Sequence, residues 1–173
     1  MAPSTRLGSR RLTAYTTSEW TDLFVAAAGA SAALAGLVFV AVSINIERIL
    51  QFEGLPERAL AAMLLLVNVL MVSIIGLIPG QSHTALGAEL LGVSLVFTAV
   101  IGTRVARSLP TGHLSWMVSR LAVMAIGTLP MLVGAISLLA LEGGGLYWIV
   151  GGILGATIGA VANAWVLLVE ILR

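Results

Sequence analysis

Five long apolar stretches, separated by short polar connections, fill the chain from Trp20 to Leu172. Each is about twenty residues or longer, the length that an α-helix needs to cross a bilayer core. Because the bilayer core offers no water to unpaired backbone groups, such stretches are expected to be helical. The sequence therefore predicts an all-α integral membrane bundle of about five transmembrane helices. The alternative is four spans plus one interfacial or re-entrant helix.

Turn residues and charges set the expected boundaries of these helices. Thr16 and Glu19 match a capping box, which predicts a helix start near Thr17. Pro56 suits the first turn of the second helix, and Pro130 predicts a kink in the fourth. The polar segment 1–19 is expected to be a flexible N-terminal tail ahead of a transmembrane domain over 20–173. The helices are expected at about 20–47, 57–78, 84–104, 114–141 and 146–172.

Composition excludes several classes of protein. The 173 residues are 59% hydrophobic and only 10% charged, which is outside the range of soluble domains. A net charge of +1 and the lack of a basic stripe argue against nucleic acid as a partner. The chain has no cysteine, and His83 and His113 fall in different loops, so no metal site or cofactor is expected. With no converging catalytic groups, we do not expect an enzyme.

The distribution of arginines predicts the orientation in the membrane. Five crossings put the two termini on opposite sides. One side carries Arg48, Arg58, Arg104, Arg107, Arg120 and Arg173. The other side carries the three arginines of the tail, at positions 6, 10 and 11. The positive-inside rule then favours the N-terminus outside and the C-terminus in the cytoplasm, although arginines ahead of a first helix normally hold that end inside.

Two helices carry small residues at a spacing of four, which places them on one helix face. The last helix has Gly151, Gly155 and Gly159, followed by Asn163 and, seven residues further, Glu170; the first has Ala28, Ala32 and Gly36, followed by Glu47. Small residues at this spacing are the usual means by which membrane helices pack closely. They either pack helices within one subunit or join copies of the last helix around an axis, as in a glycine zipper.

Polar residues inside the apolar stretches are the other candidates for function. Asn68, near the centre of the second helix, and Asn163 need a hydrogen-bond partner in hydrocarbon. Each either bonds a neighbouring helix or lies on an ion path. Glu89 is either solvated in the headgroup region or a cation site within the bundle. Arg120 either reaches the interface or pairs with Glu47 or Glu170.

The stretches FVAAAGASAALAGLVFVAVSINIERIL and GGGLYWIV…NAWVLLVEILR resemble a family of small, uncharacterised bacterial membrane proteins familiar from actinobacteria. The resemblance covers most of the chain beyond the tail. Some of these relatives are labelled as modulators of a membrane-bound AAA protease, but this chain has fewer expected spans than proteins with that role. The resemblance thus implies a multi-pass protein of the bacterial plasma (inner) membrane and no particular mechanism.

Two functions are consistent with these features. The first is a homo-oligomeric pore or small-ion pathway, with Asn163 and Glu170 at its inner end and Glu47, Asn68 and Glu89 as further candidates. The second is a non-transporting accessory or scaffold subunit, or a regulator, of another membrane protein. The expected partners are membrane lipids, further copies of the chain, and in the second case a different membrane protein.

Overall fold

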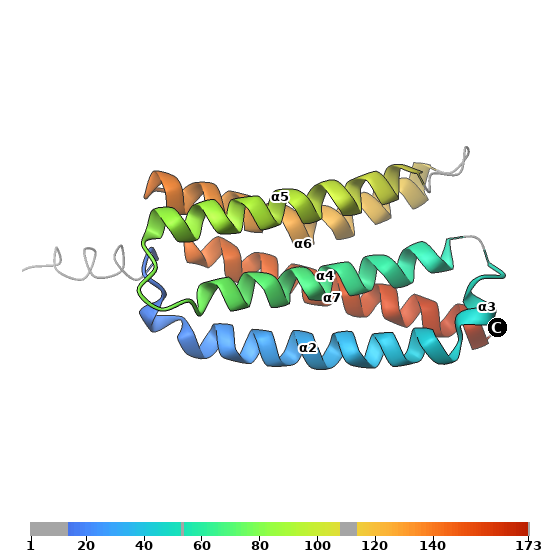
Figure 1. Cartoon of the computed structure of the whole chain (residues 1–173). Coiled ribbons are helices and arrows are strands. Elements are labelled where there is room, and N and C mark those ends of the chain that lie inside the picture. Colours follow the sequence, from blue (N-terminus) through green and yellow to red (C-terminus); the bar gives the residue numbers. More distant parts are fainter. Residues whose placement is uncertain (1–13, 53, 108–113, 173) are drawn as a thin grey trace, which may run out of the picture.

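The computed structural model describes residues 14–52, 54–107 and 114–172, with side chains except at 105–107, 114–121, 123–124 and 170–172. The described part is helical and contains no strand. Its elements are η1 (Thr17–Glu19), α2 (Thr21–Ile44), α3 (Ile46–Ile49), α4 (Leu55–Gly76), α5 (His83–Arg107), α6 (Leu114–Ala140) and α7 (Leu146–Leu172). The five long helices lie side by side along one axis, and the described chain starts and finishes at opposite ends of the bundle (Figure 1).

Helix α4 is the centre of the bundle and α2 lies at its edge. α4 packs against α2, α5 and α7, while α6 packs against α5 and α7. Half of the most apolar window of α4 is buried, compared with 11% of that of α2. In α2 only Phe24 and Ser31 are buried. The first helix is thus attached to the bundle along one side and presents the rest of its surface outward.

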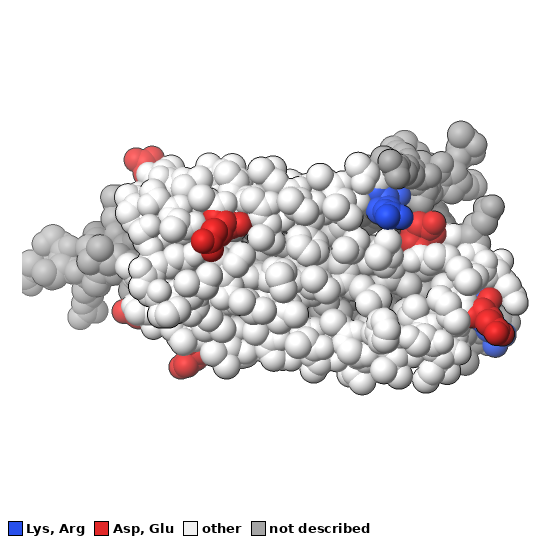
Figure 2. All heavy atoms as spheres, viewed as in Figure 1, with Lys and Arg blue, Asp and Glu red and all other residues white. Residues whose placement is uncertain are grey.

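The helices have the length and hydropathy of membrane spans. Four qualify by both measures: Thr21–Ile44, Leu55–Gly76, His83–Arg104 and Leu146–Val169. Within α6, Ala125–Ala140 forms a shorter apolar helix. On the face shown in Figure 2, acidic side chains lie toward both ends and basic side chains toward the end that holds α3, with an uncharged band between them. The predicted class is confirmed: the chain is an all-α membrane protein, consistent with a bundle of about five helices.

Glycines let α6 and α7 approach each other closely. A Cβ at Gly127 would lie 3.0 Å from Cα of Ala156, and one at Gly152 would collide with the side chain of Met131. A Cβ at Gly134 would lie 2.6 Å from Cδ1 of Ile149. Contact of this kind gives dispersion energy in a medium where the hydrophobic effect between helices is absent. Helix α6 continues unbroken through Pro130.

The turn between α6 and α7 forms hydrogen bonds with Ala14 and Tyr15, the first described residues of the chain. The backbone N–H of Leu146 donates to the carbonyl of Ala14 at 2.8 Å, and that of Gly144 donates to the Tyr15 hydroxyl at 3.2 Å. Gly145 has φ of +50° and faces Ala14 so closely that a side chain would not fit. The end of the segment expected as a flexible tail is therefore docked on the bundle; residues 1–13 lie outside the described part.

Two local expectations at the first helix need correction. A 3-10 turn begins at Thr17 as predicted, but the Thr16 side chain makes no capping hydrogen bond, and α2 itself starts at Thr21. Phe24 lies near the start of the first span, where an aromatic residue is typical of an anchor at the membrane interface, but it is 1% exposed and packs under Gly76 of α4. Trp20 packs edge-on against Tyr147, with ring centroids 4.9 Å apart. Both aromatic rings thus fasten α2 to neighbouring helices.

Candidate functional site

Asn68 lies fully buried in α4, where it joins α4 to α6. Its Nδ2 donates to Sδ of Met131 at 3.1 Å, and its Oδ1 has no hydrogen-bond partner among the described residues. The thioether sulfur is a weak acceptor, so the interhelical bond compensates only part of the cost of burying an amide. The interhelical contact expected of Asn68 is present, with an acceptor that the sequence did not identify.

Helix α5 carries two buried hydroxyls that the sequence analysis overlooked. Ser94 is fully buried, and neither its Oγ nor Oγ1 of Thr98 has a hydrogen-bond partner among the described residues. The two residues are four apart and share a face of α5. Their spacing was a usable signal, but single hydroxyls in apolar helices commonly bond their own backbone, as Ser73 does with the carbonyl of Val69.

The glycine stripe of α7 faces α6 of the same chain. A Cβ at Gly155 would collide with the carbonyl oxygen of Ile126, and Gly159 is buried. Pro130, four residues after Ile126, has no N–H, so that carbonyl lacks its usual partner within the helix. Gly151 is exposed, with Pro130 Cβ at 3.9 Å from the position of an added Cβ. At Gly155 the structure therefore shows close packing of helices within one subunit, the first of the two interpretations of the stripe.

No hydrogen bond joins the described polar residues that were proposed for an ion path. The Asn163 amide donates to the carbonyl of Gly159 in its own helix at 3.0 Å. Glu89 is exposed, and its Oε2 accepts a bond of 2.6 Å from Gln81. Glu47 is exposed in α3, at the other end of the bundle from Glu89. The side chains of Glu170 and Arg120 lie outside the described part, so their predicted pairing stays a prediction.

The small residues of α2 have a different register from the one predicted. Ala28 is half-buried, while Ala32 and Gly36 are exposed, so the predicted stripe winds from the bundle to the outside. The small residues on the face opposite the buried Phe24 and Ser31 are Ala26, Gly29, Ala33 and Gly36, here called the outward stripe. All four are exposed, and a Cβ added at Gly29 or Gly36 would meet no atom within 4 Å. This stripe is unoccupied by the described part of the chain.

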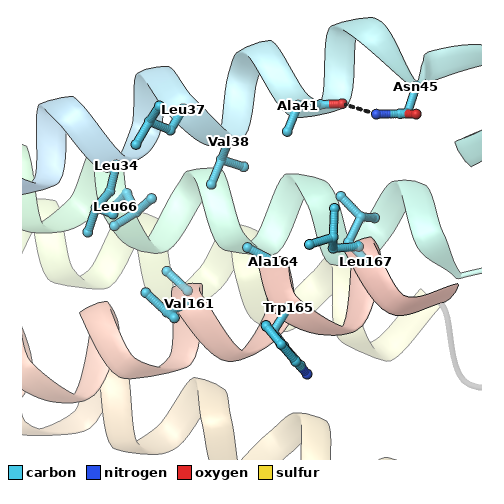
Figure 3. A pocket seen from close by; sticks show the side chains of 12 residues that line it. Leu34, Leu37, Val38, Ala41, Asn45, Leu66, Val161, Ala164, Trp165 and Leu167 are labelled. Atoms are coloured by element: carbon cyan, nitrogen blue, oxygen red, sulfur yellow. Dashed lines mark hydrogen bonds between the residues drawn. The ribbon is translucent and has the colours of Figure 1, made fainter. Parts of the chain in front are cut away.

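A groove lies beside the outward stripe, between α2 and α7, with Leu66 of α4 at its base (Figure 3). Its volume is about 290 Å³. Aliphatic side chains and Trp165, which is 66% exposed, form most of its walls. Asn45 lies at one end, where its Nδ2 donates to the carbonyl of Ala41 at 2.9 Å.

Comparisons with known proteins identify no relative: no family model, no curated protein and no solved structure matches the chain. The resemblance to small bacterial membrane proteins, the location in the inner membrane and the orientation of the termini accordingly stay predictions.

Proposed function

We propose that this chain is a non-transporting accessory or scaffold subunit whose outward stripe packs against a transmembrane helix of another membrane protein. The observation that carries the proposal is the unfilled stripe of Ala26, Gly29, Ala33 and Gly36 on a helix with little burial in its own bundle. By contrast, Gly152 and Gly155 of α7 pack closely against α6.

The physical argument rests on what small residues do in a bilayer. Lipid tails solvate leucine and valine well, so a lipid-facing surface has no need for glycine. Association of membrane helices depends on close van der Waals contact, and interfaces are enriched in glycine and alanine for that reason. Glycine in the middle of a helix also costs about 1 kcal/mol relative to alanine. Gly29 and Gly36, two glycines with no such contact on one face of the least buried of the four membrane spans, are therefore best explained by contact with another helix, whereas α5 has a single one, Gly92, in the part of the chain that the structure describes.

The pore alternative has weaker support. It required the Gly151–Gly155–Gly159 face of α7 to meet copies of itself, whereas α6 covers Gly155. Asn163, its proposed lining residue, uses its amide donor within its own helix. A pore could also be built from other faces of the chain. A count of copies distinguishes it from a scaffold, because a pore requires a closed ring of copies.

Site-specific cross-linking in the host membrane tests the proposal. The chain has no cysteine, so Ala33→Cys gives a single attachment point for a benzophenone reagent within the outward stripe. Ala99→Cys places the same reagent on an exposed part of α5 as the matched control. We expect a discrete protein adduct from position 33 that position 99 does not give.

A second pair of variants tests whether that adduct depends on the shape of the stripe. Gly36→Leu should abolish the adduct at position 33 because it fills the stripe. Gly92→Leu makes the same change at another exposed helical glycine with no atom within 4 Å of its Cβ and should leave the adduct intact. Adducts that form equally from positions 33 and 99, or that survive Gly36→Leu, would overturn the proposal.

A further inference from the structure

We infer that the groove between α2 and α7 is a phospholipid-binding site, with one acyl chain along the groove and the headgroup at α3. This inference does not depend on the outward stripe or on its partner. The groove lies in the half of the bundle that ends at α3, and it runs from Leu34 and Leu66 toward Asn45 (Figure 3).

The size and the lining of the groove fit an unbranched apolar chain. The groove runs lengthwise between α2, from Leu34 to Asn45, and α7, from Ala160 to Leu168, so it lies parallel to the acyl chains of a surrounding bilayer. The groove is near the lower limit of small-ligand pockets, about 300 Å³. The short side chains of Ala41 on α2 and of Ala160 and Ala164 on α7 leave the space between the two helices open. The direction and the aliphatic lining of the groove therefore match a single acyl chain.

The acyl chain alone gives little selectivity, because bulk lipid is as apolar as the groove. Selectivity must come from polar groups at the end of the groove, and these are present. Leu167 lines the groove and also packs with Ile49 of α3, so α3 adjoins the end of the groove. Glu47 and Arg48 of α3 are both exposed. One N–H of the Asn45 side-chain amide donates to the carbonyl of Ala41, and its Oδ1 is an acceptor beside the groove.

These groups complement a headgroup that carries charges of both signs. The guanidinium of Arg48 matches a phosphate, which it can bind through two parallel hydrogen bonds. The carboxylate of Glu47, adjacent to Arg48 in the sequence, favours an ammonium group and disfavours additional negative charge. Glu57 and Arg58, near the start of α4, carry one charge of each sign, so they do not change the net charge at this end of the bundle. This combination of charges favours a phosphoethanolamine headgroup over phosphoglycerol.

Native mass spectrometry of delipidated protein, titrated with phosphatidylethanolamine or phosphatidylglycerol of identical acyl chains, tests the assignment. We expect one lipid retained per chain, with phosphatidylethanolamine preferred by about three-fold, the scale of an exposed ion pair. Glu47→Gln should remove this preference. Arg48→Gln should weaken the binding of both lipids by a similar factor.

A second set of variants fills the groove with a larger side chain and is tested in the same titration. Ala164→Phe on the α7 wall, and independently Ala41→Phe on the α2 wall, should lower the affinity for both lipids at least ten-fold. Ala99→Phe, on the exposed surface of α5, should bind as the unaltered chain does. Circular dichroism confirms that each variant is folded, and the two walls provide independent variants if one fails to fold.

Three outcomes would overturn the inference. The first is retention of lipid in both filled variants at the level of the unaltered chain. The second is a lipid preference that Glu47→Gln does not change. The third is loss of a protein dimer, with no loss of lipid, in the filled variants, which would make a second copy the occupant.

Discussion

Adding one methyl group at Gly155 or at Gly36 should have opposite effects on stability. Both glycines lie inside long helices, so replacement by alanine gains the same helix propensity, about 1 kcal/mol. At Gly36 the new Cβ meets no atom within 4 Å, and that gain should appear as added stability. At Gly155 the new Cβ would collide with the Ile126 carbonyl oxygen and lie 2.9 Å from Ile126 Cγ2.

The magnitude follows from the cost of overpacking. Inserting a methyl group into a close-packed site costs about 1–3 kcal/mol. The collision is with backbone rather than with a flexible side chain, so the upper part of that range applies. Because the propensity term is common to both variants, Gly155→Ala should be less stable than Gly36→Ala by about 2–3 kcal/mol.

The assay is unfolding in mixed micelles along an SDS titration, followed by far-UV circular dichroism. The comparison of the two variants removes errors that come from the membrane-mimetic solvent. Equal free energies of unfolding for Gly155→Ala and Gly36→Ala would refute the close approach of α7 to α6. For the same reason Gly155→Leu cannot be used to test whether copies of the chain associate through α7, since it would disrupt the packing of α7 against α6 within one chain.

Two further predictions concern buried polar groups. Asn68→Leu removes an amide whose oxygen has no described partner and whose N–H meets only the Met131 sulfur, so stability should be unchanged or up to about 1 kcal/mol higher; a loss above about 2 kcal/mol in the same titration would show that the amide is fully bonded. Ser137→Ala removes a hydroxyl that donates to the Glu142 carbonyl and accepts from the Gly145 N–H at 2.8 Å. It should cost about 1–3 kcal/mol and speed hydrogen exchange at Gly145; unchanged exchange there would contradict the role of Ser137 in the turn.

The number and type of helices could be predicted because long apolar runs have few alternatives in a bilayer. Turn chemistry located most boundaries: α4 begins at Leu55 with Pro56 in its first turn, and Gly145 immediately precedes α7. The docking of residues 14 and 15 could not be predicted, since it depends on a backbone pairing with Leu146, more than a hundred positions later. The polar composition of segment 1–19 gave no sign of that contact.

The orientation of each helix face was the harder part. In a soluble protein the buried face is the apolar one, but α2 is apolar all round, so periodicity does not identify the side that meets the bundle. The predicted stripe of Ala28, Ala32 and Gly36 was therefore out of register with the outward stripe. For α7 the spacing of glycines was informative, yet it did not indicate whether the partner was α6 or another copy. Pro130 in α6 was the missing signal, because it exposes the Ile126 carbonyl that only glycine accommodates.

The most direct test of the account is a count of copies of the purified chain in lipid nanodiscs, by mass photometry or native mass spectrometry. A scaffold whose outward stripe is kept for a different membrane protein should be a monomer, or a dimer that Gly36→Leu leaves intact. A closed ring of three or more copies that persists in Gly36→Leu would contradict the account and favour a pore.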